Sequence, residues 1–139
     1  MGIESIQFQR GQRASLAKTI TEADVRTYAE LIGDRNPLHT DEEFARRSRF
    51  GRRTVHSTFS GDLVSAVLGN QLPGPGSVYL SQQTEFLAPI YLGDTITATV
   101  EVISWRPDKR IITLKTDCHK QDDTQVVTGK AVLLVDPAE

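Results

Sequence analysis

The chain has a single cysteine, Cys118, which excludes an internal disulfide framework. Positive charge is not in excess: the sequence has sixteen lysines and arginines and eighteen aspartates and glutamates, which gives a net charge of -2. That balance argues against binding to nucleic acid through bulk electrostatics. The sequence also has no apolar run long enough to span a bilayer and no basic-then-apolar signal pattern at its start. We therefore expect a cytoplasmic protein that binds neither nucleic acid nor membranes.

Two common functional motifs are missing as well. No serine lies in a Gly-x-Ser-x-Gly elbow, so nothing supports the catalytic triad of a serine hydrolase. Gly74 and Gly76 alternate with prolines, and this pattern predicts a turn, not a phosphate-binding loop. Neither triad hydrolysis nor nucleotide binding through a glycine-rich loop is therefore expected.

The length of the chain suits one domain, so we expect residues 1–139 to form a single folded unit. Residues 1–20 alternate weakly in polarity and predict one or two short strands. Thr21 followed by Asp24 resembles a helix capping box, and Gly33 directly follows the last residue of the helical pattern. A first helix should therefore run between these two signals.

Two further helices are predicted beyond this point. Thr40 and Glu43 form a second capping-box pattern, which opens a short helix reaching about residue 48. Residues 57–69 repeat apolar side chains at helical spacing on most sides, yet the segment is rich in small residues. A slim helix that is apolar on most sides is expected to lie buried against a sheet.

The pattern changes to a period of two after residue 76. The apolar residues expected to share one strand face are Val78, Leu80, Phe86 and Ala88. Residues 95–102 alternate most regularly, and turn signals then separate two further strands, the last at about 126–135. Long antiparallel strands after one buried helix predict an α+β domain whose sheet wraps around that helix.

A candidate catalytic pair lies in the stretch 33–39. Asp34 and His39 place a carboxylate and an imidazole five residues apart, on a loop stiffened by Pro37. Two titratable groups at the junction of two helices are a candidate acid/base pair. The alternative is structural: Asp34 would cap or pair locally, and His39 would begin the next helix. The pair alone does not decide between these interpretations.

A second candidate site lies at His56 and Ser57, where the buried helix is expected to begin. The first backbone N–H groups of a helix lack intrahelical partners and carry the positive end of its dipole. They can stabilise a carbonyl oxygen that gains negative charge during a reaction. The alternative is that the serines here simply permit close packing. Asp34, His39 and His56 have no diagnostic metal-ligand spacing, so no metal is expected.

Basic residues are concentrated between residues 46 and 53. The five arginines of this segment are Arg46, Arg47, Arg49, Arg52 and Arg53. We favour a solvated surface, because a run of like charge is usually surface. The alternative is a basic rim that binds the phosphates of a ligand.

Residues 28–41, YAELIGDRNPLHTD, followed by residues 44–45, resemble the signature of the MaoC-like (R)-specific enoyl-CoA hydratases. The similarity continues through shorter segments at 55–56, 68–74, 86–89 and 93–94. It extends from about residue 20 to the C-terminus and so covers nearly the whole chain. One departure is Ser57, because the family commonly has glycine directly after the His56 position. This difference bears on substrate preference more than on the class of reaction.

The resemblance implies a hotdog fold, in which an antiparallel sheet wraps around a long central helix at 57–69. It also implies a homodimer whose two sheets join edge to edge. The reaction would be reversible addition of water to a trans-2-enoyl-CoA, giving the (R)-3-hydroxyacyl-CoA, with no metal or redox cofactor. Asp34 and His39 match the catalytic pair and would hold one water between them, with Asp34 favoured as the base.

The resemblance also assigns residues around the pair. Asn36 would fix the loop, the backbone N–H of Ser57 would bind the thioester carbonyl, and Ser65 would line the acyl pocket. His56 lies in a matching segment and is expected to help bind the substrate. That substrate would be an acyl-CoA or an acyl-carrier-protein thioester. The acyl chain length and the pathway are left open.

We therefore predict a hydro-lyase, either an enoyl-CoA hydratase or a 3-hydroxyacyl-thioester dehydratase. Two alternatives stay open at this point. A hotdog acyl-CoA thioesterase would bind the same substrate but release a free thiol. A non-catalytic subunit would bind acyl thioesters, or a partner chain, without turnover.

Overall fold

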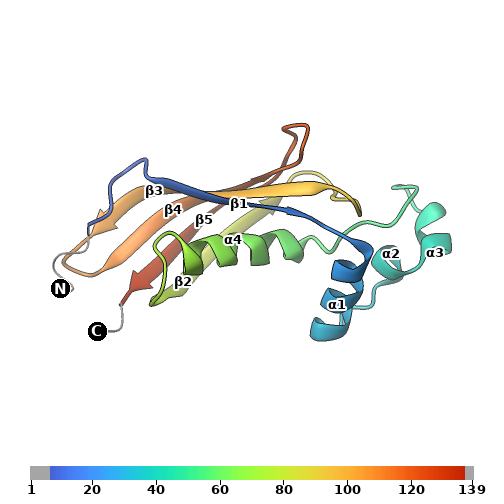
Figure 1. The fold of residues 1–139 in the computed structure, drawn as a ribbon, viewed down its shortest axis with the longest axis horizontal. Helices are drawn as coiled ribbons and strands as arrows, with labels where there is room; N and C mark the ends of the chain where they lie inside the picture. Colours follow the sequence, from blue (N-terminus) through green and yellow to red (C-terminus); the bar gives the residue numbers. More distant parts are fainter. Residues whose placement is uncertain (1–6, 137–139) are drawn as a thin grey trace.

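The structure, a computed structural model of the chain, describes residues 7–136. Four helices and five strands are found in these residues, and Figure 1 shows their arrangement. In chain order they are β1 (Arg13–Thr19), α1 (Glu22–Ile32), α2 (Pro37–Thr40), α3 (Glu42–Arg46), α4 (Thr58–Asn70), β2 (Ser77–Phe86), β3 (Thr95–Arg106), β4 (Ile111–His119) and β5 (Gln125–Val135). The strand predicted in the first twenty residues is β1, and the part of that prediction on residues 1–6 lies outside the described residues.

All five strands form one antiparallel sheet in the order β1-β3-β4-β5-β2. Helix α4 lies along one face of this sheet, while α1, α2 and α3 gather beyond one end of it (Figure 1). The hairpins β3–β4 and β4–β5 join neighbouring strands, as the turn signals predict. The α+β architecture with one helix against a curved sheet is therefore confirmed.

The core lies between α4 and the sheet. Phe59, Leu63 and Val67 are buried on the helix, and every second residue of β3 from Ile96 to Val102 is buried beneath it. Burial of such side chains is the main favourable term in folding. The helical spacing at 57–69 and the alternation at 95–102 are thus both confirmed by burial.

Strand β2 forms one end of the sheet order, as β1 forms the other. Val78, Leu80 and Phe86 are 57%, 54% and 52% exposed. A register shift between Tyr79 and Ser81 interrupts the two-residue period expected for these positions. The apolar face predicted from the sequence is therefore not continuous, and much of it faces outward.

The helix signals around residue 40 are partly wrong. The N-cap of α3 is Asp41, not Thr40: its Oδ1 accepts from the N–H of Glu43 at 3.0 Å and of Phe44 at 3.2 Å. The helix ends at Arg46, two residues earlier than expected. Thr40 instead closes the short helix α2, where a backbone hydrogen bond from Asp41 to Pro37 ends that turn. His39 therefore lies within a helical turn of its own and not ahead of one.

The signals that bound α1 are confirmed. Thr21 and Asp24 form the reciprocal capping box, and Gly33 ends the helix with a φ of 77°. Such a left-handed conformation favours glycine because it has no Cβ. Among the described residues, no helix is long and apolar enough to cross a membrane.

Candidate active site

The loop after α1 is held by its own polar side chains. The side chain of Asn36 accepts a hydrogen bond from the N–H of Leu38 at 3.0 Å and so caps α2, with Pro37 at the first helical position. The carboxylate of Asp34 accepts from the N–H of Asn36 at 3.3 Å. Asn36 thus has the loop-fixing role expected from the resemblance. The short loop directs Asp34 back toward the helical turn that carries His39.

The ring of His39 is fixed from the opposite side. Its Nδ1 lies 2.7 Å from the carbonyl oxygen of Thr54 and 3.1 Å from the hydroxyl of the same residue. A carbonyl oxygen can only accept, so Nδ1 carries the proton and donates it. The neutral ring then has its lone pair on Nε2. This nitrogen is therefore available to accept a proton or a hydrogen bond.

The surroundings of His39 favour its neutral form. Its side chain is 9% exposed, and this burial is the main cause that lowers its pKa below 6.5. The charges of His56 and Arg53 lower the pKa further, whereas the hydrogen bond to Thr54 and the carboxylate of Asp34 raise it. The net direction is downward, so His39 is neutral near pH 7.

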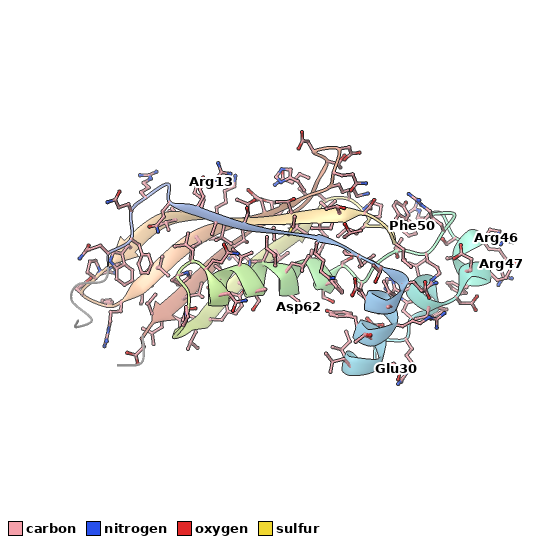
Figure 2. The ribbon with its side chains drawn as sticks, in the orientation of Figure 1. Arg13, Glu30, Arg46, Arg47, Phe50 and Asp62 are labelled. Carbon is pink, nitrogen blue, oxygen red and sulfur yellow. The ribbon has the colours of Figure 1, made fainter. Side chains whose placement is uncertain are left out.

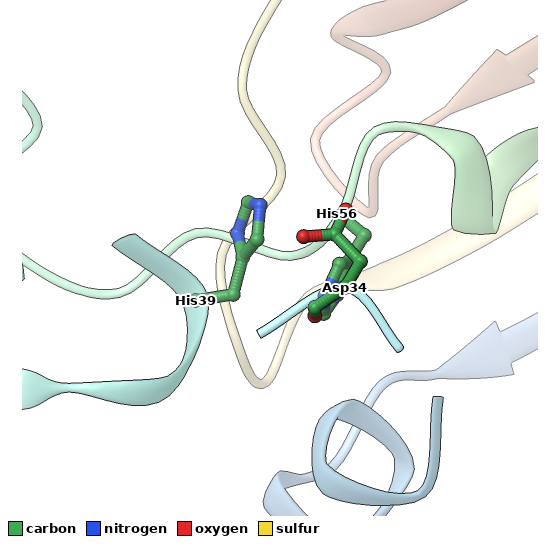
Figure 3. A group of neighbouring side chains, drawn as sticks. All are labelled: Asp34, His39 and His56. Atoms are coloured by element: carbon green, nitrogen blue, oxygen red, sulfur yellow. The ribbon is translucent and has the colours of Figure 1, made fainter. Parts of the chain in front are cut away.

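His56, in the segment before α4, contacts both Asp34 and His39. It is 1% exposed, and its Nε2 donates to the backbone carbonyl of Asp34 at 2.8 Å. Its ring lies over that of His39, with centroids 4.1 Å apart, and meets the edge of Tyr28 on the other side. Figure 3 shows the carboxylate of Asp34 directed toward His39, with His56 close behind. Three residues from two distant segments thus form one cluster.

The same cluster bears on the question of a metal. One nitrogen or oxygen each of Asp34, His39 and His56 lies within 4.8 Å of the others, a spacing that would also suit a cation. Nε2 of His56 donates to a carbonyl and cannot bind a metal while it carries that proton, whereas Nδ1 of the same ring is buried with no hydrogen-bond partner among the described residues. The expectation that the site works without a metal stays a prediction.

A pocket of about 480 Å³ opens beside His39. Its wall is mostly apolar, with Leu38, Phe50 and Phe86 among the lining residues, and Ser57 contributes a polar group at the start of α4. Asp34 is not among the lining residues, but its carboxylate lies within 4.8 Å of a ring nitrogen of His39, which is one of them. A mostly apolar cavity with a few polar groups on one side is typical of a small-molecule site.

The backbone at Ser57 is suited to binding an oxygen anion. Ser57 is the N-cap residue of α4, and its side chain makes no capping hydrogen bond. Within residues 7–136 its N–H has no hydrogen-bond partner either. An unpaired N–H at the positive end of a 13-residue helix attracts a developing negative charge. Ser57 and His39 line the same pocket, so the two candidate sites expected from the sequence adjoin each other.

The arginine-rich segment does not form a single surface. Arg46 pairs with Glu43 at 2.9 Å, and Figure 2 shows Arg46 and Arg47 at the outer end of the molecule. The guanidinium of Arg52 stacks on the ring of Tyr91, 3.9 Å from its centroid. These positions agree with the favoured interpretation, a solvated and partly paired surface.

Arg53 does not fit either interpretation of the segment. It is 8% exposed, donates from Nε to the carbonyl of His39 at 2.7 Å and pairs through Nη1 with Glu22 of α1. The charge run contains no signal that distinguishes it from its neighbours. This residue beside the candidate site was therefore missed by sequence reasoning.

A family profile described as "MaoC like domain" matches residues 5–125. The chain belongs to the MaoC-like domain family. An (R)-specific enoyl-CoA hydratase of Rhodospirillum rubrum is 43% identical over 127 residues, covering 91% of this chain and 88% of that protein. An (R)-specific enoyl-CoA hydratase of Aeromonas caviae is 46% identical over 123 residues, covering 88% and 92%.

A solved structure agrees with these sequence relationships. The (R)-hydratase from A. caviae involved in PHA biosynthesis superposes with a TM-score of 0.89 at 43% identity, covering 93% of this chain and 98% of that one. The hotdog fold expected from the resemblance is thereby confirmed, and this MaoC-like chain is a hydro-lyase.

Not every expected site residue of this MaoC-like protein lies in the pocket. Asp34, Asn36, His56 and Ser65 are not among the residues that line it within the described chain, and Asp34 only adjoins it through His39. Ser65 is exposed on α4, eight residues and so about 12 Å along the helix from Ser57. It lies beside the phenol of Tyr79 on β2. The assignment of Ser65 to the acyl pocket and of Asn36 and His56 to substrate binding stays a prediction.

Proposed function

We propose that the chain is an (R)-specific enoyl-CoA hydratase, which adds water reversibly to a trans-2-enoyl-CoA and forms the (R)-3-hydroxyacyl-CoA. One observation carries the proposal: His39, with its lone pair on Nε2, and Ser57, with its free N–H, line one pocket, and the carboxylate of Asp34 lies within 4.8 Å of a ring nitrogen of His39. These are the groups that hydration of an unsaturated thioester needs. The names of the two bacterial relatives support the same reaction.

In the proposed reaction one water lies between Asp34 and His39. Ionised Asp34 and neutral His39 are both acceptors, so each accepts a hydrogen bond from this water. One of them takes a proton as the water oxygen bonds to C3, and the electron pair of the C2=C3 bond moves onto the thioester oxygen. The enolate then collapses and takes a proton at C2 from the pair. The hydroxyl group added at C3 and the proton added at C2 therefore both come from one water.

The preference for Asp34 as the base stays a prediction. The Nδ1–H tautomer of His39 leaves Nε2 as a second acceptor for the same water. In the proposed reaction both groups accept from the same water, so a proton can pass between them through it. We therefore assign the base to the Asp34/His39 pair as a unit.

The thioester oxygen is proposed to accept from the backbone N–H of Ser57. This donor is preformed at the start of α4 and needs no reorganisation when the enolate forms. The side chain of Ser57 adds a Cβ and a hydroxyl to the pocket wall, where the family commonly has glycine. We propose that this difference tunes which acyl chains the enzyme accepts and leaves the reaction unchanged.

We also propose that the protein is a homodimer joined along β2. Val78, Leu80 and Phe86 are about half exposed on a strand at the end of the sheet, and such an edge pairs readily with another strand. Phe86 also lines the pocket, so the dimer would close the site on this side. Sedimentation velocity should give twice the monomer mass. A monomer at micromolar concentration would contradict this part of the proposal.

The remaining expectations concern partner and location. The substrate carrier is proposed to be coenzyme A or an acyl-carrier protein, bound without a resident cofactor. The family profile spans most of the chain, which supports one MaoC-like domain. Cys118 is buried and its pKa is raised to about 12, mainly by burial, so this thiol is unreactive and needs no oxidising compartment. This agrees with the proposed cytoplasmic location.

Hydration of crotonyl-CoA tests the proposed function. The purified protein should remove the ultraviolet absorbance of the conjugated thioester, and chiral analysis should identify (R)-3-hydroxybutyryl-CoA as the product. Release of free thiol, detected with a thiol-reactive dye, would support the thioesterase alternative instead. Binding of crotonyl-CoA without turnover would indicate a non-catalytic subunit, and either result would overturn the proposal.

A further inference from the structure

A buried arginine contacts the backbone of the catalytic turn. Arg53 is 8% exposed, and its guanidinium makes two different contacts. Its Nε donates to the backbone carbonyl of His39 at 2.7 Å, and its Nη1 pairs with the carboxylate of Glu22 in the first turn of α1. The guanidinium therefore joins the start of α1 to the residue that carries the catalytic imidazole.

The burial of Arg53 is not explained by a contribution to folding stability. A buried guanidinium loses its hydration, and the third nitrogen of Arg53, Nη2, is buried with no partner among the described residues. Glu22 is about half exposed, so the ion pair is open to solvent on one side. A buried charge that is only partly satisfied calls for another explanation, and the hydrogen bond to His39 offers one.

The position of His39 depends on few other contacts. Its ring is held by Thr54, and its own N–H donates to the carbonyl of Asn36 at 2.9 Å. Helix α2 has only four residues, so no N–H within it can donate to the carbonyl of His39. Arg53 donates to this carbonyl instead. Without this donor, nothing else in residues 7–136 hydrogen-bonds that carbonyl.

We propose that Arg53 is a positioning residue for the hydration reaction, which holds the backbone of His39 so that Nε2 of the imidazole meets the catalytic water. This inference rests on the proposed function, because it assigns Arg53 a role in that reaction. Arg53 itself does not touch the substrate. It acts through His39, and the rigid fork of an arginine is needed because one side chain must reach two acceptors at once.

The charge of Arg53 gives the proposal a second, independent readout. The charged groups that face His39 are Asp34, His56 and Arg53, with Glu22 behind the guanidinium. Arg53 and His56 disfavour the protonated imidazole and Asp34 favours it. Removal of the Arg53 charge should therefore raise the pKa of His39, while removal of the Glu22 charge should lower it by leaving Arg53 uncompensated.

Three variants of this ion pair separate geometry from charge. Arg53→Gln should lower kcat with crotonyl-CoA by about tenfold to a hundredfold, as expected for a displaced catalytic group, with KM within about twofold of wild type. It should also shift the acidic limb of the kcat/KM profile to higher pH. Arg53→Lys keeps the charge but lacks the fork, so kcat should stay low while the limb returns toward wild type. Glu22→Gln should shift the limb to lower pH.

The matched control is Arg26→Gln. Arg26 binds the other oxygen of the same Glu22 carboxylate at 2.6 Å, but it is exposed and does not contact His39. This variant should keep the wild-type kcat and pH profile. Equal losses in Arg26→Gln and Arg53→Gln, or limb shifts in the same direction in Glu22→Gln and Arg53→Gln, would overturn the proposal.

Titration of the His39 ring by NMR keeps the test independent of turnover. If the wild-type protein does not hydrate crotonyl-CoA, the proposed function fails, but opposite pKa shifts of His39 in Glu22→Gln and Arg53→Gln would still establish the electrostatic contact. If Arg53→Gln does not fold, Arg53→Lys and Glu22→Gln still decide the question. Unchanged His39 titration and wild-type kcat in these two variants would reject the role of Arg53.

Discussion

The imidazole of His39 donates from Nδ1 to the carbonyl of Thr54 at 2.7 Å, and the N–H of Thr54 donates to the carbonyl of Leu38 at 3.2 Å. These two bonds run in opposite directions between the turn at 37–40 and the segment before α4. They fix the tautomer of His39 and bring it beside His56. Two motifs that are separate in the sequence therefore meet as one site.

The first prediction concerns the catalytic pair. Asp34→Asn and His39→Ala should each lower kcat for crotonyl-CoA by about 10²- to 10⁴-fold, because neither the amide of asparagine nor the methyl of alanine can take a proton from the catalytic water. The double variant should be little worse than either single one, since the two groups act as a unit.

His119→Ala provides the control for these variants. It removes a histidine at the end of β4, outside the candidate site, and kcat should not change. Circular dichroism should report folded protein in every case. Wild-type turnover in Asp34→Asn or His39→Ala would show that the pair is not catalytic.

The second prediction is the pH dependence of activity and stability. Burial lowers the pKa of His39 below 6.5, so the neutral form persists as the pH falls through 6.5. The decrease of kcat/KM at low pH should therefore lie below pH 6.5. If protonation of His39 causes this decrease, it should be absent from the residual activity of His39→Ala. An acidic limb above pH 7 would contradict the neutral base.

Stability should respond to the same group. Between the lowered folded-state pKa and 6.5, the unfolded chain binds more protons at His39 than the folded one. The contribution of His39 is thus fully present above pH 6.5 and is lost as the pH falls toward the folded-state pKa. Urea unfolding at several pH values should give a smaller loss below pH 6.5 in His39→Ala than in wild type.

The third prediction tests the N–H of Ser57 with a matched pair of substitutions. Proline lacks this N–H, and the φ of -57° at residue 57 suits its ring. Ser57→Pro should lower kcat by about 10²- to 10³-fold, the usual loss when one oxyanion donor is removed. Ser57→Gly keeps the donor and should keep kcat, with altered preference among acyl chain lengths. Equal activity in the two variants would exclude the backbone donor.

Local signals in the sequence predict much of this structure. The capping box at Thr21, the glycine at 33 and the alternation at 95–102 depend on residues close together in the chain, and the structure confirms all three. The Asp34/His39 pair is equally local, because five residues and one proline set its geometry. Such features need no knowledge of distant contacts.

The features that sequence reasoning missed depend on distant segments. Thr40 and Asp41 are both good helix caps, and the choice of Asp41 follows from the turn at 37–40, which Thr54 ties to the neighbouring segment. The burial of Arg53 requires α1 to present Glu22 at the right place, 31 residues earlier. His56 faces the carbonyl of Asp34, not the pocket, for the same reason. None of these contacts has a pattern in the sequence.

The last prediction concerns the strand that borders the pocket. A Cβ built on Gly129 of β5 would lie 2.2 Å from the backbone oxygen of Gln83 on β2, a distance that forces the two strands apart. Gly129→Ala should therefore destabilise the protein by about 1–3 kcal/mol, the usual cost of overpacking. Because β2 ends at Phe86 in the pocket wall, KM for crotonyl-CoA should rise as well.

Gly69→Ala makes the same chemical change where there is room for it. No atom lies within 4 Å of a Cβ added at Gly69, which is an exposed residue near the end of α4. Alanine is the better helix former, so this variant should be more stable than wild type by about 0.5–1 kcal/mol. Urea unfolding with unchanged m-values would measure both effects. A Gly129→Ala variant as stable as wild type, or more stable, would mean that the close approach of β2 and β5 at Gly129 does not limit stability, and an unchanged KM would mean that the position of β2 does not govern substrate binding.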